Sequence, residues 1–281
     1  MVILFKLRKG YLGYISANLF LILVCFIIIT PLIWSVSTSF KSRSEVFAHN
    51  FTLIPKQVIW QNYVEIIKAA PFGQYLINTV LVVTGILILQ LLLIIPAAYA
   101  FAKLEFPGKS FLFFIFIAQM LLPLQSIIVP NYLFLKNLGL INTRIALILP
   151  FAASGYGIFL IRQTFKQIPE ALIDSARIDG CGDLRVIWHI MIPLAKPTIT
   201  AFSLISIVIH WNDYFWPLIV TNTADVRTLA IGLGMFVQQE SGADWPLLMA
   251  GTMFIVLPIL LFFLCTQNVF INNLIKSGLK E

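Results

Sequence analysis

The segment 170–197 reads EALIDSARIDGCGDLRVIWHIMIPLAKP and lies between two long apolar stretches. Only 11% of the chain is charged, so the charge gathered here marks a segment that differs in role from its neighbours. Its charged residues include Glu170, Asp174, Arg177, Asp179, Asp183 and Arg185.

The composition is that of an integral membrane protein. Of 281 residues, 59% are hydrophobic and the mean hydropathy is +0.93, whereas soluble domains are typically about 45–50% apolar. Cys25, Cys181 and Cys265 show no CxxC or CxxH spacing, which indicates neither a disulfide framework nor a metal site. The formal charge of +7 is attributed to cytoplasmic loops facing anionic lipid, and nucleic acid is not an expected partner.

Charge-poor runs predict six transmembrane helices, so the expected fold class is an all-α, polytopic membrane protein. Each run supplies the roughly 17–25 apolar residues that a membrane crossing needs. The first run is longer than the apolar core of a signal peptide and is kept as a span. The whole chain, 1–281, is treated as a single transmembrane domain with spans near 14–36, 74–102, 110–132, 144–163, 198–220 and 246–268.

The distribution of basic residues predicts the orientation. With the N-terminus inside, twelve of the 19 Lys and Arg residues lie in cytoplasmic segments and seven lie outside. Since an excess of Lys and Arg marks cytoplasmic loops, both termini are expected to be cytoplasmic. The loop 164–197, which contains the charged segment, then faces the cytoplasm.

Local signals within this loop predict two short helices. The first begins at Glu170, whose charge suits the positive end of the helix dipole. It ends at Gly180, which offers the left-handed position after a helix. The second begins at Asp183 as a cap and is expected to stop at Pro193 and Pro197. The alternatives are a solvated amphipathic loop and a compact knob that fits a groove on another protein.

The spacing of residues 174–193 in this loop resembles a known sequence motif. Asp174-Ser175-Ala176, three residues, Gly180, nine residues and Ile190-Met191-Ile192-Pro193 resemble the EAA motif of bacterial ABC-importer permeases, E-A-A-x3-G-x9-I-x-L-P. The spacing matches throughout. Three residue types depart from the pattern: Asp174 for Glu, Ser175 for Ala and Ile192 for Leu.

Further short sequence motifs resemble those of the carbohydrate-uptake branch of these type I importers, which includes the maltose and glycerol-3-phosphate systems. They are Leu138 to Thr143 (LGLINT), Trp211 to Tyr214 (WNDY) and Trp60 to Tyr63 (WQNY). The resemblance covers most of the chain. It implies a six-helix permease domain that forms a heterodimer with a second permease in the bacterial cytoplasmic (inner) membrane.

The resemblance also implies how transport is driven. The EAA helix would dock on a separate cytoplasmic ABC ATPase, present in two copies, which binds ATP and magnesium. This chain would then be a non-catalytic subunit with no cofactor of its own. Gly108-Lys109-Ser110 lacks the earlier glycine of a P-loop and a preceding strand. The residues expected to couple to the ATPase are Asp174, Ser175, Ala176, Asp179, Gly180 and Pro193.

Polar residues within the spans are candidates for a translocation path, because polar groups are costly in hydrocarbon. The alternatives are hydrogen bonds between packed helices and, near 211–214, an aromatic belt. The structural interpretation is favoured for 211–214, and the choice for the others is open. The candidates are Gln119, Gln125, Asn131, Trp211, Asn212, Asp213 and Tyr214.

Two outer segments, 41–72 and 222–245, are candidate docking surfaces. The resemblance implies that they meet an extracytoplasmic solute-binding protein, and the alternative is a pair of solvent-facing connectors. The candidate contacts in the second segment are Gly232, Gly234, Gln238, Gln239 and Glu240.

The leading functional hypothesis is therefore a permease subunit of an ATP-driven carbohydrate importer, embedded in membrane lipid. Glycerol-3-phosphate or a glycerophosphodiester is the runner-up solute, disfavoured because no Lys or Arg lies deep within a span. An ion-coupled secondary transporter would need several buried carboxylates, and Asp213 stands alone. A membrane enzyme would need convergent side chains, whereas His49, His189 and His210 are dispersed.

Overall fold

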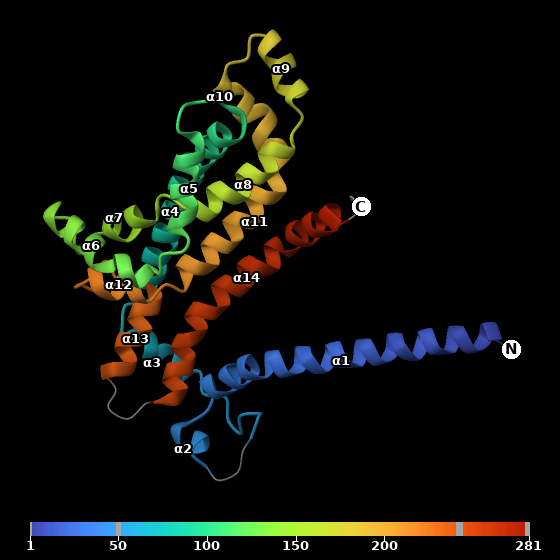
Figure 1. Ribbon diagram of the computed structural model, residues 1–281. Helices are drawn as coiled ribbons and strands as arrows, with labels where there is room; N and C mark the ends of the chain where they lie inside the picture. Colours follow the sequence, from blue (N-terminus) through green and yellow to red (C-terminus); the bar gives the residue numbers. More distant parts are fainter. Residues whose placement is uncertain (1, 49–51, 240–243, 279–281) are drawn as a thin grey trace. The chain divides into compact units, whose positions relative to one another are not determined.

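The computed structural model describes residues 2–48, 52–239 and 244–278, and every regular element within these ranges is a helix (Figure 1). The chain divides into two compact units. Unit 1 comprises residues 1–70 and 235–255, and unit 2 comprises 71–234 and 256–281.

Unit 1 contains α1 (Val2–Ser39), α2 (Arg43–Val46) and α3 (Gln61–Ala69). α13 (Leu229–Gln239) and α14 (Trp245–Gly278) contribute residues to both units. The other helices belong to unit 2: α4 (Phe72–Lys103), α5 (Lys109–Gln119), α6 (Leu124–Asn137), α7 (Arg144–Ile148), the 3-10 helix η1 (Leu149–Phe151), α8 (Gly155–Gln167), α9 (Glu170–Ile178), α10 (Asp183–Val186), the π-helix η2 (Ile187–Met191), α11 (Ile192–Trp211) and α12 (Phe215–Val220).

Among the described residues, four helical stretches are long and apolar enough to cross a membrane. A fifth crossing arises if the bent pair Arg144–Phe151 and Gly155–Gln167 counts as one span. α5 is apolar but shorter. The predicted all-helical fold class is confirmed. Helix length and composition alone give fewer transmembrane spans than the six expected. The four long stretches are Ala17–Ser39, Phe72–Lys103, Asp183–Trp211 and Trp245–Gln267.

The expected span 110–132 is not one helix in the structure. α5 ends at Gln119, and α6 begins only at Leu124. Pro123 separates them with an extended backbone, φ −65° and ψ 135°. Because proline lacks an N–H and disfavours helical geometry in the residue before it, the chain breaks here rather than bending.

The expected span 144–163 is also interrupted, with a bend of 46° between η1 and α8. Buried side chains satisfy the backbone at this break. Gln90 of α4 donates its amide N–H to the Phe151 carbonyl over 2.9 Å and accepts from the Ser206 hydroxyl of α11 over 2.6 Å. Ser154 caps the first turn of α8. The backbone polar groups that hydrocarbon cannot solvate are thus paired with side chains.

The first short helix of the charged segment is confirmed as α9. Gly180 follows it with φ 79°. The Cys181 N–H donates to the Ala176 carbonyl over 2.9 Å, and the Gly180 N–H donates to the Arg177 carbonyl over 3.0 Å. These two hydrogen bonds form a Schellman motif, which fixes the end of α9.

The predicted stop at Pro193 and Pro197 is wrong. The helix that starts at Asp183 continues through both prolines to Trp211. The π-helix η2 precedes Pro193, and the Ile192 N–H donates five residues back to the Ile187 carbonyl. A π turn widens the helix locally, which accommodates a proline that would otherwise clash with the preceding turn. Asp183 is the first residue of α10 rather than its cap, and Gly182 is the capping residue.

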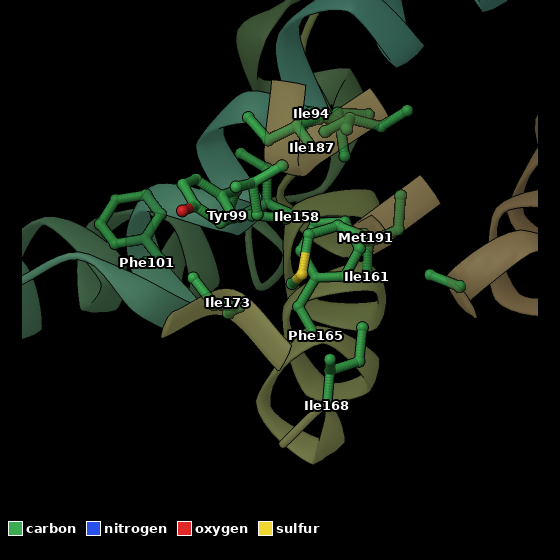
Figure 2. Packing of buried hydrophobic residues seen from close by; sticks show 14 of the residues in the cluster. Ile94, Tyr99, Phe101, Ile158, Ile161, Phe165, Ile168, Ile173, Ile187 and Met191 are labelled. Carbon is green, nitrogen blue, oxygen red and sulfur yellow. The ribbon is translucent and has the colours of Figure 1, made fainter. Parts of the chain in front are cut away.

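The main buried cluster of unit 2 joins α4, α8, α9, η2 and α11 (Figure 2). Ile173 of α9 points into this cluster with Tyr99 and Phe101 of α4. Phe165 of α8 and Met191 of η2 are fully buried in the same cluster. Since burying one large aliphatic side chain stabilises by about 1.5–3 kcal/mol, the cluster holds α9 as packed structure rather than as a loose loop.

Gly155 gives a test of the packing between α5 and α8. A Cβ added at Gly155 would lie 2.3 Å from the Phe116 carbonyl oxygen, whereas a Cβ at Gly73 in α4 would meet nothing within 4 Å. Because a main-chain atom cannot rotate away, Gly155→Ala is expected to destabilise the protein by about 1–3 kcal/mol. Thermal unfolding in detergent checks this, with Gly73→Ala as the control. Equal melting temperatures for the two variants would contradict the close packing.

Candidate functional site

α9 presents one buried face and one exposed face. Ile173 and Ala176 are buried in the unit 2 cluster. Asp174 and Ser175 are exposed on the other side, and Ile178 is 86% exposed. The exposed side of this packed helix therefore carries an isoleucine and a carboxylate. We call the exposed side chains Asp174, Ser175 and Ile178 the docking face.

The structure brings most of the predicted coupling residues together on α9 and its terminal turn. Asp179 is the C-cap residue and Gly180 makes the left-handed turn after it. The Ser175 hydroxyl donates within the helix to the Leu172 carbonyl over 3.0 Å. Pro193 is exposed but belongs to α11 and is not part of α9.

Sequence reasoning missed the groups that hold α9 in place. The Lys103 ammonium donates to the Ile168 carbonyl over 2.7 Å and to the Glu170 carboxylate over 2.8 Å. The Tyr99 hydroxyl donates to the Asp183 carboxylate over 2.8 Å. The only sequence signals were a tyrosine within an apolar run and a lysine at its end. Neither signal identifies a partner more than sixty residues away.

An ion pair strengthens the turn after α9. Arg177 donates to the Asp183 carboxylate over 3.3 Å. This hydrogen bond raises the pKa of the Arg177 guanidinium above its ordinary value. The guanidinium therefore remains a cation throughout the physiological pH range, and this contact does not act as a pH switch.

The candidate path residues are spread over three elements of unit 2. Gln119 is exposed at the end of α5, and Asn131 is half-buried in α6. Gln125 lies in α6, and its side chain is outside the described part of the structure. The two helices are separate, so these residues do not share the single helix face that a continuous span would give.

The residues 211–214 interrupt the expected span 198–220. The Asn212 amide donates to the Val208 carbonyl over 2.8 Å, which caps α11. The Asp213 carboxylate accepts from the Trp216 N–H over 3.4 Å at the start of α12. The Trp216 indole N–H donates to the Ala146 carbonyl over 2.9 Å. Each of these hydrogen bonds pairs a backbone group near a helix end.

Trp211 also lines a cavity of about 200 Å³ in unit 2. The cavity is mainly apolar, and Thr84 supplies a hydroxyl to its wall. Helices α4, α11 and α14 form it. Trp211 is therefore a candidate path residue that the structure places at a cavity wall. The remaining lining residues are Val80, Val83, Leu87, Ile207, Pro258, Ile259 and Phe262.

The outer segment 222–245 contains a helix, α13, rather than a plain loop. A Cβ added at Gly232 would lie 2.2 Å from the Tyr75 ring, and one at Gly234 would lie 2.4 Å from the Tyr214 ring. These glycines therefore permit close helix packing. Gln238 and Gln239 lie in α13 with side chains outside the described part, and Glu240 lies outside the described residues.

Hydrogen bonds attach the start of this segment to α4. The Asn78 amide, which is buried, donates to the Asp225 and Arg227 carbonyls over 2.8 and 3.0 Å. The Leu229 N–H donates to the Thr79 hydroxyl over 2.8 Å. α4 thus holds the outer segment near its first turns as well as the charged segment at its last turns.

In the other outer segment, 41–72, residues of the motif Trp60 to Tyr63 (WQNY) contact the end of α1. The Asn62 amide donates to the Ser39 and Lys41 carbonyls, each over 2.9 Å. The Tyr63 hydroxyl lies 2.8 Å from the Ser39 hydroxyl. Trp60 packs edge-on against Phe40. These contacts fix the chain after α1 and leave the indole of Trp60 largely exposed.

The chemistry in these surfaces is that of binding and packing. Among the residues that the structure describes, no group of three or more His, Cys, Asp or Glu side chains is arranged to hold a metal ion. Gly108 and Lys109 form the start of α5, where the Lys109 ammonium donates to the Leu104 carbonyl over 2.7 Å.

Known proteins with similar sequences and structures share the helical membrane architecture described above. Residues 11–270 match the family of binding-protein-dependent transport system inner membrane components. The sn-glycerol-3-phosphate transport system permease protein UgpE of Yersinia pestis is 31% identical over 94% of this chain and 96% of its own length. The diacetylchitobiose uptake system permease protein NgcG of Streptomyces coelicolor is 33% identical over 88% and 83%.

Two further proteins extend the comparison. The arabinooligosaccharides transport system permease protein AraQ of Halalkalibacterium halodurans is 31% identical over 92% of this chain and 93% of its own length. A chain in the crystal structure of a bacterial ABC transporter involved in alginate import has a TM-score of 0.84 at 23% identity. It covers 94% of this chain and 98% of its own length, which establishes the shared fold.

Gly180 and Gly182 form a matched pair for testing the end of α9. A Cβ at either position would meet nothing within 4 Å, but only Gly180 has positive φ. Gly180→Ala is therefore expected to cost about 1–2 kcal/mol and to speed amide hydrogen exchange across α9. Gly182→Ala is expected to leave exchange unchanged. Equal exchange in the two variants would contradict a role for the left-handed turn.

Proposed function

This chain belongs to the family of binding-protein-dependent transport system inner membrane components, and on that premise we propose that it is one of two permease subunits of an ATP-driven carbohydrate importer. Its relatives are permeases of systems named for glycerol-3-phosphate and for oligosaccharides. The chain would form half of the translocation path and have no catalytic role. A second, related permease would form the other half.

The observation that carries this proposal is the docking face on α9. Asp174, Ser175 and Ile178 are exposed, while Ile173 and Ala176 anchor the same helix in the unit 2 cluster. A rigid helix transmits an applied displacement, whereas a flexible loop would absorb it. We assign the docking face to a cleft on a cytoplasmic ABC ATPase, present in two copies, that binds ATP and magnesium.

The proposed topology has six membrane crossings with both termini in the cytoplasm. Five crossings correspond to the four long helices and the bent pair formed by η1 and α8. We assign the sixth to α5 and the start of α6, although proline interrupts them. The excess of Lys and Arg in the segments assigned to the inside supports this orientation.

The side of the membrane opposite the docking face is assigned to an extracytoplasmic solute-binding protein. One solved structure with this fold is a bacterial alginate ABC transporter in complex with a periplasmic protein bound to alginate pentasaccharide. The candidate surfaces here are the segment 41–72, with its exposed Trp60, and α13 with the residues that follow it. Asn78 donates to the Asp225 carbonyl and Thr79 accepts from the Leu229 N–H at the start of α13, and Asn62 donates to the Ser39 carbonyl at the end of α1.

The solute is proposed to be a neutral carbohydrate. An anionic solute such as glycerol-3-phosphate needs cations along its path, whereas no Lys or Arg lies deep within an expected span. Nearer the ends of the expected spans, Arg144 donates to the Asn78 amide oxygen over 3.0 Å, and Arg227 donates to the Asn222 carbonyl over 3.2 Å. The glycerol-3-phosphate relative keeps this solute as the second candidate.

Uptake by the complete transporter tests the proposal. Proteoliposomes containing the transporter and its solute-binding protein are assayed with labelled arabino-oligosaccharide, diacetylchitobiose and sn-glycerol-3-phosphate. We expect ATP-dependent uptake of an oligosaccharide. Asp174→Lys reverses a charge on the docking face, and Gly180→Pro prevents the left-handed turn, so each is expected to reduce uptake to background while the chain remains in the membrane.

The matched control is Glu105→Gln. Glu105 pairs with Lys109 over 2.9 Å in the turn between α4 and α5, its side chain is 91% exposed, and Lys109 also donates to the Leu104 carbonyl. Removing the charge of such an exposed carboxylate typically changes stability by about 0–1 kcal/mol, so normal uptake is expected. If uptake survives both Asp174→Lys and Gly180→Pro, the assignment of the docking face is wrong.

A further inference from the structure

The last turn of α4 contacts the segment around α9 at two positions. Tyr99 and Lys103 are four residues apart in α4 and therefore lie on the same side of the helix. Lys103 binds groups at the start of α9, and Tyr99 binds Asp183, the first residue of α10, just after α9. Along the chain, α4 and α9 are separated by the whole of α5 to α8, so these hydrogen bonds add a polar connection to the apolar packing between the two helices.

Lys103 holds the beginning of α9. Its side chain is only 6% exposed, and its ammonium donates to the Ile168 carbonyl over 2.7 Å and to the Glu170 carboxylate over 2.8 Å. A buried ammonium is costly unless it is paired and hydrogen-bonded. Both acceptors lie at the start of α9, so any displacement of this end would leave the charge without its partners.

Tyr99 holds the turn that follows α9. The residue is 1% exposed, and its hydroxyl donates to the Asp183 carboxylate over 2.8 Å. Asp183 also accepts from Arg177 in the last turn of α9, over 3.3 Å. The tyrosine is thereby connected to α9 through one carboxylate that joins α10 and α9.

The middle of α9 packs on the same part of α4. Ile173 and Ala176 are buried in the cluster that contains Tyr99 and Phe101 (Figure 2). α8 contributes a further contact, because Arg162 donates to the Phe101 carbonyl over 3.0 Å and stacks on the Phe113 ring at 3.8 Å. Apolar packing alone permits sliding, whereas hydrogen bonds at the two ends fix the register.

We propose that Tyr99 and Lys103 are positioning residues that clamp both ends of α9 to α4, so that α4 moves with α9 as one body when the ATPase displaces the docking face. The inference rests on the proposed function and deepens it. α8 and α11 adjoin the coupling segment along the chain, whereas α4 depends on this clamp for its polar connection to α9. α4 also holds the outer segment through Asn78 and Thr79, so one helix joins the coupling segment to the outer surface.

A spin-label distance measurement on the full transporter in lipid nanodiscs tests the clamp. Labels are placed on cysteines introduced at Leu81 of α4 and Ala171 of α9, both exposed. The native residues Cys25, Cys181 and Cys265 are first replaced by alanine. Distances are recorded without nucleotide and with ATP, magnesium and vanadate. In the otherwise unchanged chain we expect one narrow distribution with the same centre in both states.

The test variant is Tyr99→Phe combined with Lys103→Met, which removes the polar atoms and keeps the ring and the aliphatic stem. We expect its α4 to α9 distribution to broaden and to shift by about 2 Å or more with ATP and vanadate. ATP hydrolysis is expected to continue while uptake per ATP falls by about tenfold. Tyr99→Phe with Lys103→Arg is expected to recover part of the coupling, since the guanidinium can bind the same acceptors.

The outcomes separate the clamp from a purely structural role. Glu105→Gln, which removes the charge of an exposed carboxylate, is expected to match the unchanged chain in distance and in uptake per ATP. A double variant that also matches the unchanged chain in both readouts overturns the clamp. So does an ATP-dependent change in the α4 to α9 distance of the unchanged chain. A preparation with no ATP-driven uptake in any variant refutes the proposed function instead.

Discussion

The constraint on which this structure depends is that hydrocarbon cannot solvate a backbone N–H or C=O. Regular helix satisfies it through its own backbone hydrogen bonds, as in α4 and the continuous stretch from α10 to α11 outside their prolines. At two of the breaks between helices of unit 2, side chains pair backbone groups. Gln90 pairs with the Phe151 carbonyl at the bend before α8, and Asp213 accepts the Trp216 N–H between α11 and α12.

The same constraint explains why the charged segment stands apart from the rest of the chain. In the cytoplasmic position that we propose for it, the backbone of α9 can end in a Schellman motif, and its exposed face can carry both a carboxylate and an isoleucine. Lys103 and Tyr99, at the end of α4, join this segment to the membrane part of unit 2. Buried polar contacts of this kind fix one arrangement, because any other leaves a charge unpaired.

Local signals in the sequence were sufficient to predict α9, because its start at Glu170 and its end at Gly180 depend on neighbouring residues. They failed where the outcome depends on how a proline is accommodated. Pro123 breaks a predicted span, whereas Pro193 is tolerated after a π turn that no residue pattern announces. The role of Tyr99 could not be predicted for another reason. Its partner, Asp183, lies 84 positions along the chain, and only the fold brings the two residues together.

The most direct test of the proposed coupling is a cryo-electron microscopy structure of the assembled transporter with ATP, magnesium and vanadate. We predict that Asp174, Ser175 and Ile178 are buried in a cleft on the ATPase, with α9 still bonded to Lys103 and with both chain termini on the ATPase side. A structure in which the ATPase binds elsewhere, or in which α9 lies on the opposite side of the membrane, would contradict this coupling.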